Sequence, residues 1–220
     1  MITLIYSAII PTILLMFWIY SRDKINPEPK QDVLRLYILG AIIVFPAGII
    51  ERHLLISKAL NPNNDGLIPI LITAFFIAGM VEEFLKAGIF QRGIYHHKEF
   101  DEPIDGIVYG VAIALGFAMV ENVMYVTSYG LSVAFLRSVT AIPAHMFFGI
   151  TMGYYFARAK FGLSSVYRAY LIPAFYHGIY DSFAMIDGFL GNVGLTIFLI
   201  YLIFLSTRYI QQLRHQAILY

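Results

Sequence analysis

Residues 67–90 read LIPILITAFFIAGMVEEFLKAGIF, an apolar stretch interrupted mainly by Glu82, Glu83 and Lys86. It is long enough for the roughly 20 residues that cross the hydrocarbon core of a bilayer. A charge near the bilayer centre costs several kcal/mol on insertion scales, so an ionisable residue there indicates a functional site. The stretch therefore predicts a membrane helix that carries such a site.

The composition of the whole chain agrees with a membrane protein. Of its 220 residues, 59% are hydrophobic and only 13% are charged, which excludes a soluble globular domain and a disordered chain. The net charge of +1 excludes a strongly basic nucleic-acid binder, so no nucleic-acid partner is expected. Because the chain has no cysteine, any metal must be bound by His, Asp or Glu side chains.

Seven stretches are long and apolar enough to span a bilayer. They predict an all-α, polytopic helical bundle that forms one integral-membrane domain over residues 1–220, with its core helices in about 67–187. A six-helix alternative has a re-entrant segment near residues 187–192, where the last two stretches almost touch. The stretches are residues 2–20, 33–50, 67–90, 104–126, 132–157, 167–187 and 189–206.

The orientation follows from the positive charges, because Lys and Arg accumulate on the cytoplasmic side. The connections after the even-numbered stretches hold only Arg52, Lys58 and Arg137. We therefore expect the N-terminus outside the cell and the C-terminus in the cytoplasm. The connections after the odd-numbered stretches hold Arg22, Lys24, Lys30, Arg35, Arg92, Lys98, Arg158, Lys160, Arg168, Arg208 and Arg214.

Polar residues gather in four consecutive stretches, from the third to the sixth, and the other three stretches resemble a supporting wall. Beyond the charges of residues 67–90, they are Asp105, Glu121, Asn122, His145, His177 and Asp181. Taken alone, Asp105, Asn122 or Lys86 is more often a helix-packing hydrogen bond than a catalytic group. The joint set of two adjacent glutamates and two histidines has no such structural explanation, and it predicts one shared site.

Helical spacing refines this site. Lys86 lies three and four residues after the glutamate pair, so its ammonium can reach either carboxylate and hold it ionised. His177 and Asp181 are four residues apart, the usual arrangement in which a carboxylate orients an imidazole. The two histidines fall near mid-membrane, with Glu121 within a few residues of that depth.

Small residues recur at a spacing of four in two of these stretches. They are Gly149 and Gly153 after His145, and Gly106, Gly110 and Ala114 after Asp105. Such stripes let two helix backbones approach closely, which brings the side chains of neighbouring helices within reach of one another.

Two histidines and several carboxylates form a ligand set of the type that binds zinc and leaves a position for water. Water activated by a metal or a carboxylate could attack a peptide carbonyl. Two non-proteolytic alternatives remain: a proton-coupled transporter, although neither inverted repeats nor interrupted helices are evident, and a non-catalytic scaffold that binds partner helices.

Known protease motifs are absent: the sequence has no HExxH, no GxGD and no Gly-x-Ser-Gly. The motifs that are present closely resemble the PrsW family of bacterial intramembrane proteases, over nearly the whole chain and with no departure at the motif positions. They are NPEP at 26–29, EEFLK at 82–86, FDEPIDGIVYG at 100–110, GF at 116–117 followed by Glu121-Asn122, His145 with Gly149, and HGIYD at 177–181.

The resemblance implies a multi-pass protein of the bacterial cell membrane, similar to the CAAX prenyl endopeptidases. Members make the site-1 cut in a membrane-spanning anti-sigma factor, which leads to release of an extracytoplasmic-function sigma factor under envelope stress. It also implies that Glu82 and Glu83 match the family's glutamate pair, Glu121 its next glutamate, and His145 and His177 its histidines.

A mechanism follows as a hypothesis. Water held between Glu82 or Glu83 and the two histidines hydrolyses a peptide bond, with zinc bound by Glu83, Glu121, His145 and His177, or with Glu121 as a proton shuttle instead of a ligand. Lys86, Asn122, Asp181 and Asp105 support this site: Asn122 donates to the developing oxyanion, and Asp181 orients His177.

Overall fold

The computed structural model describes residues 2–22, 26–56 and 66–217, so Lys24, Lys58 and the turn at 61–65 lie outside the described residues. All regular structure in these ranges is helical, which confirms the all-α prediction. The elements are α1 (Ile2–Tyr20), α2 (Lys30–Ile42), α3 (Val44–Ile56), α4 (Leu67–Ile72), the π-helix η1 (Thr73–Gly79), α5 (Met80–Gly93), α6 (Asp105–Tyr129), α7 (Leu131–Val139), α8 (Ala141–Lys160), α9 (Tyr167–Met185) and α10 (Phe189–Ala217).

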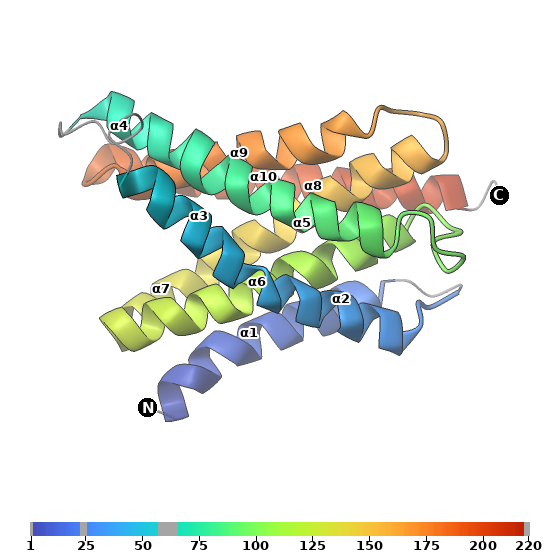
Figure 1. The fold of residues 1–220 in the computed structure, drawn as a ribbon, viewed down its shortest axis with the longest axis horizontal. Helices are drawn as coiled ribbons and strands as arrows, with labels where there is room; N and C mark the ends of the chain where they lie inside the picture. Colours follow the sequence, from blue (N-terminus) through green and yellow to red (C-terminus); the bar gives the residue numbers. More distant parts are fainter. Residues whose placement is uncertain (1, 23–25, 57–65, 218–220) are drawn as a thin grey trace.

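The seven expected stretches coincide with seven helical segments, some of them built from two or three elements. Within the part of the chain that the structure describes, five segments are both long and apolar enough to cross a membrane, namely Lys30–Ile56, Leu67–Gly93, Asp105–Tyr129, Leu131–Lys160 and Phe189–Gln216. Helix α1 starts at the opposite end of the long axis from the end of α10 (Figure 1), as an odd number of crossings requires. The orientation and the count of seven crossings stay predictions.

Two segments are interrupted, although no interrupted helix was evident from the sequence. Helix α2 ends at Ile42 and α7 ends at Val139. Each end lies four residues before a proline, Pro46 or Pro143. A proline removes the hydrogen bond to the carbonyl four residues earlier and its ring clashes with that carbonyl, so the helix breaks there. The lack of interrupted helices therefore no longer counts against a transporter.

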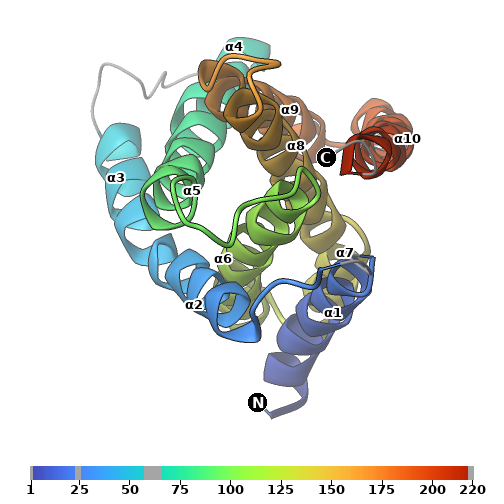
Figure 2. The same ribbon diagram turned by 90° about the vertical axis from the view of Figure 1, so that its right-hand side faces the viewer.

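Helix α6 lies in the middle of the bundle and α10 at its edge (Figure 2). The side chains of α6 are buried without a gap from Asp105 to Ala118. Small residues make this packing possible on two sides. Gly116 faces the backbone of α2, whereas Gly110 faces the backbone of α8 at Gly149 and Gly153. The expected close approach of two glycine stripes is confirmed.

We predict that Gly149→Ala destabilises the bundle by about 1–3 kcal/mol, the usual range for overpacking. A Cβ atom at residue 149 would lie 2.7 Å from the Cβ of Ala114 and 2.8 Å from the carbonyl oxygen of Gly110, neither of which can move without shifting α6. The measurement is reversible unfolding in detergent micelles.

Gly88→Ala is the matched control, because a Cβ there meets only the end of the Arg92 side chain, at 3.4 Å. It should leave stability unchanged or raise it by up to about 1 kcal/mol through helix propensity. Equal effects of the two substitutions would contradict the packing argument.

Candidate active site

The glutamate pair lies in the first turn of α5, directly after the π-helix η1. Glu82 is 6% exposed and Glu83 is fully buried, so both face into the bundle although adjacent helix positions point about 100° apart. Single π-turns inside α-helices are rare and occur frequently at functional sites. Here η1 ends at Gly79, three residues before Glu82, and the missing side chain of Gly79 leaves room for α9 at Ala174 and Gly178.

The Lys86 ammonium lies at the centre of the site and is fully withdrawn from solvent. Its Nζ atom is 3.0 Å from Glu82 Oε2, 2.7 Å from Glu83 Oε1 and 3.2 Å from His145 Nδ1. The same atom lies 3.9 Å from the centre of the Phe117 ring. The predicted contact of Lys86 with both glutamates is thus present, and His145 joins it from α8.

His177 approaches from α9 on the other side of Glu83. Its Nδ1 is 3.0 Å from Glu83 Oε1, and its Nε2 is 3.4 Å from Asp181 Oδ2. The imidazole stacks on Phe148 at 4.8 Å between ring centres and lies edge-to-face with His145 at 5.2 Å. The two histidines, predicted to share one site, therefore share it.

Both histidines follow one pattern. Each directs Nδ1 towards the buried centre and places Nε2 beside an outer carboxylate. That carboxylate is Asp181 for His177 and Glu121 for His145, whose Oε2 is 2.9 Å from Nε2. A carboxylate on the outer nitrogen is the arrangement typical of metal-ligating histidine, because it fixes the tautomer and ring orientation and raises the basicity of the inner nitrogen.

Four buried residues offer one ligand atom each within 4.8 Å of one another: Glu82, Glu83, His145 and His177. Glu83 Oε2 is buried and has no hydrogen-bond partner among the described residues. A buried acceptor without a partner is destabilising, and a bound cation would satisfy it. The donor set of two imidazoles and two carboxylates suits a divalent metal such as zinc. The residues present therefore fit a metal ion, which would compete with the Lys86 ammonium for the same lone pairs.

Compared with the expected metal ligands, the structure brings Glu82 into the group and places Glu121 one contact further out. Glu121 Oε2 is shared between His145 and the NH2 group of Arg137, at 2.9 Å from each. Arg137 in turn donates from Nε to Asn122 Oδ1 at 2.8 Å and stacks over Tyr125 at 3.8 Å. Asn122 thus contacts the site through Arg137.

A cavity of about 350 Å³ adjoins these residues, within the size range of small-molecule sites in proteins. Glu82 lines it, whereas Glu83 and Lys86 lie behind Glu82 and do not. Its ionisable lining comprises Glu51, Glu82, Glu121, Tyr125, Arg137, His145, His177, Tyr180 and Asp181, and apolar side chains form most of the rest.

Sequence reasoning missed Glu51 and Arg137. Glu51 lies one residue past the expected end of the second stretch, but α3 continues to Ile56 and carries Glu51 into the cavity, so this stretch is more than a supporting wall. Arg137 was counted as a connection residue although it lies inside the stretch 132–157. The rule that charges inside a span indicate function would have identified it.

Asp105 lies outside the buried cluster and stabilises the turn before α6. Its Oδ2 accepts hydrogen bonds from the backbone N–H groups of Asp101, at 3.0 Å, and Glu102, at 2.6 Å. These contacts fix the turn that leads into α6. Since Asp105 and Glu121 are separated by more than four helical turns, roughly 24 Å, Asp105 does not reach the buried cluster.

Comparison with known proteins gives a consistent result. The model of the PrsW family of intramembrane metalloproteases matches residues 28–207. A protein of Oceanobacillus iheyensis named protease PrsW is 40% identical over 185 residues, which cover 82% of each chain. Proteins of the same name from Clostridioides difficile and Bacillus subtilis are 36% and 34% identical over 82% of this chain and 78% and 82% of their own. No solved structure matches.

We predict that Arg137→Met destabilises the protein by about 2–4 kcal/mol, because it leaves the Glu121 carboxylate, whose side chain is 18% exposed, without its cation. In the double variant with Glu121→Gln, the loss should be smaller than the sum of the single losses by about 1–3 kcal/mol. The measurement is a double-mutant cycle from unfolding in micelles.

Lys98→Met is the control, since Lys98 pairs with Glu99 at 3.0 Å in an exposed loop and should change stability by less than about 0.5 kcal/mol. Additive effects of the Arg137 and Glu121 substitutions would show that their ion pair does not stabilise the site.

Proposed function

The chain belongs to the PrsW family of intramembrane metalloproteases, and from this we propose that it makes the site-1 cut in a single-pass, membrane-spanning anti-sigma factor. This cut would lead to release of an extracytoplasmic-function sigma factor under envelope stress. What the family establishes is coarser: a peptidase that acts on protein within the bacterial cell membrane. The observation that supports a hydrolytic site here is that Glu82 faces the cavity beside both histidines, while Glu83 is held behind it.

This difference in position separates the roles of the two glutamates. We assign Glu83, His145 and His177 to metal binding, since Glu83 contacts His177 and does not line the cavity. We assign Glu82 to the general base, because only a carboxylate at the cavity surface can reach both water and substrate. Zinc, when bound, would polarise the scissile carbonyl and acidify a water molecule.

Glu82 then moves one proton. It accepts the proton as the water oxygen forms a bond to the carbonyl carbon, and it returns the proton to the amide nitrogen as the C–N bond breaks. One water molecule is consumed, and a carboxylic acid and an amine are formed. The apolar remainder of the cavity lining keeps bulk water away from this exchange.

The negative charge on the carbonyl oxygen needs a donor. Arg137 lines the cavity, whereas Asn122, which the sequence suggested for this role, does not. Because Arg137 Nη2 and His145 Nε2 each lie 2.9 Å from Glu121 Oε2, they are at most 5.8 Å apart. We therefore assign the oxyanion contact to Arg137, with Asn122 and Glu121 holding the guanidinium in place.

We predict that Glu82→Gln lowers cleavage by at least about 100-fold, because the amide has the shape of the carboxylate but cannot accept the proton. Glu83→Gln should lower both cleavage and metal content. The assay uses liposomes that contain the protein and a single-pass anti-sigma-factor substrate, with product termini mapped by mass spectrometry.

The control is Glu99→Gln, a glutamate in the loop between α5 and α6, which should cleave like the parent. Full cleavage by both Glu82→Gln and Glu83→Gln would exclude the glutamate mechanism. If the folded parent cleaves none of several candidate substrates, the result would favour a non-catalytic scaffold or a proton-coupled transporter. A measurement of proton flux across the same liposomes then distinguishes the transporter from the scaffold.

We predict that the purified protein binds about one zinc ion and that Asp181→Asn weakens zinc affinity by about 10- to 100-fold, the usual effect of removing a histidine's outer carboxylate. Asp187→Asn, an exposed residue between α9 and α10, is the matched control and should bind zinc like the parent. Zinc content and affinity are measured by elemental analysis and competition with a chromogenic chelator. If the purified protein cleaves its substrate but binds no metal, the enzyme is a protease that uses its glutamates without a metal.

A further inference from the structure

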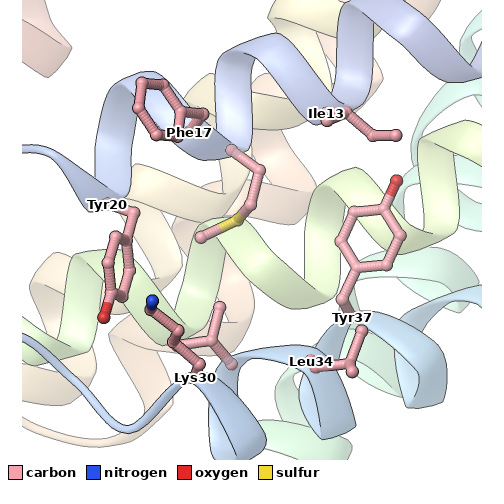
Figure 3. Close-up of a pocket in the computed structure, with 8 residues that line it drawn as sticks. Ile13, Phe17, Tyr20, Lys30, Leu34 and Tyr37 are labelled. Carbon is pink, nitrogen blue, oxygen red and sulfur yellow. The ribbon is translucent and has the colours of Figure 1, made fainter.

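Another hollow shares no lining residue with the cavity beside Glu82. It is a groove of about 470 Å³ between α1 and α2 (Figure 3). Both helices pack against α6, and Tyr37 reaches α6 at Met119, with 3.3 Å between its hydroxyl and the sulfur atom. The groove is lined by Ile13, Met16, Phe17, Tyr20, Lys30, Val33, Leu34 and Tyr37.

The two ends of the groove differ chemically. At one end the Tyr37 hydroxyl bonds to Thr12 Oγ1 at 2.8 Å and ties α2 to α1. At the other end lie Lys30 and the ring of Tyr20 (Figure 3). Lys30 is the exposed first residue of α2, and no carboxylate in the described ranges forms an ion pair with it. Lys30 and Tyr37 are seven residues apart along α2, so the apolar part of the groove between them is roughly 10 Å long.

The position of the cationic end indicates what binds there. Lys30 follows the loop after α1, near Trp18 and Tyr20, and aromatic residues of this kind mark the boundary between membrane and water. At that depth, an ammonium with no ion-pair partner among the described residues attracts an anionic headgroup. Between its two ends the groove is lined by apolar side chains, which suit a hydrocarbon chain.

We propose that this groove binds an anionic phospholipid, with one acyl chain between α1 and α2 and the phosphate at Lys30. The acyl chain would fill the apolar space between two helices that both pack on α6 and that are joined by the bond between Tyr37 and Thr12. This proposal does not depend on proteolysis, so it can fail or hold independently of the proposed function.

The chain offers a matched pair of reporters for a test, because Trp18 is its single tryptophan. Trp18 lines a different groove, formed with α8 and α10, whereas its neighbour Phe17 lines the proposed site. The double variant Phe17→Trp/Trp18→Phe therefore moves the tryptophan into the proposed site without changing the composition. Quenching by brominated phosphatidylglycerol and brominated phosphatidylcholine then gives the relative affinity of each face for the two lipids.

With tryptophan at position 17, phosphatidylglycerol should bind about five-fold more tightly than phosphatidylcholine, the effect of one lysine near the surface. Lys30→Gln should bring this ratio to about one, and Lys30→Arg should preserve it. With the native tryptophan at position 18, Lys30→Gln should leave the ratio unchanged. A ratio near one at position 17, or one that survives Lys30→Gln, would overturn the proposal. Since Lys30 is exposed, its substitution leaves folding intact, which an unchanged melting temperature checks.

Discussion

The arrangement of this protein depends on a lysine ammonium that is fully buried among carboxylates inside the bundle. Lys86 donates to Glu82 and Glu83 from its own helix and contacts His145 on α8. Without this cation, two adjacent carboxylates in a low-dielectric interior would repel each other and neither would be compensated. Without the carboxylates, the ammonium could not be buried. The three charged groups compensate one another within α5, but their burial needs the helices that cover them, and α8 and α9 add His145 and His177 to the cluster. The formation of the site is thus coupled to the packing of the fold.

That packing is itself a consequence of residues that have almost no side chain. Gly110, Gly149 and Gly153 let α6 and α8 approach to backbone contact, and this fixes the depth at which His145 faces Lys86. On the other side of the cluster, Gly79 at the end of the π-helix lets α5 approach α9, which carries His177. The small residues thus set the distances between the helices, and these distances bring the ionisable side chains into contact.

The sequence was sufficient to predict which residues lie together in one site, but not which role each of them has. Charges inside apolar stretches identified the glutamate pair and both histidines, because burial of such groups has few purposes besides function. The adjacency of Glu82 and Glu83 left their roles open, since only the π-helix, which has no clear sequence signal, decides that one lines the cavity. Glu51 was missed for a simpler reason: hydropathy locates the end of a helix only to within a few residues.

Lys86 and Lys30 show why the depth of a charge determines its role in this bundle. The first lies at the centre of the cluster with its ammonium bonded to side chains of the protein, so it is part of the interior. The second lies at the end of an apolar groove and has no ion-pair partner among the described residues, which suits an anionic lipid headgroup. Because the cavity and the groove share no lining residue, a lipid at Lys30 would leave the cavity beside Glu82 open to a protein substrate.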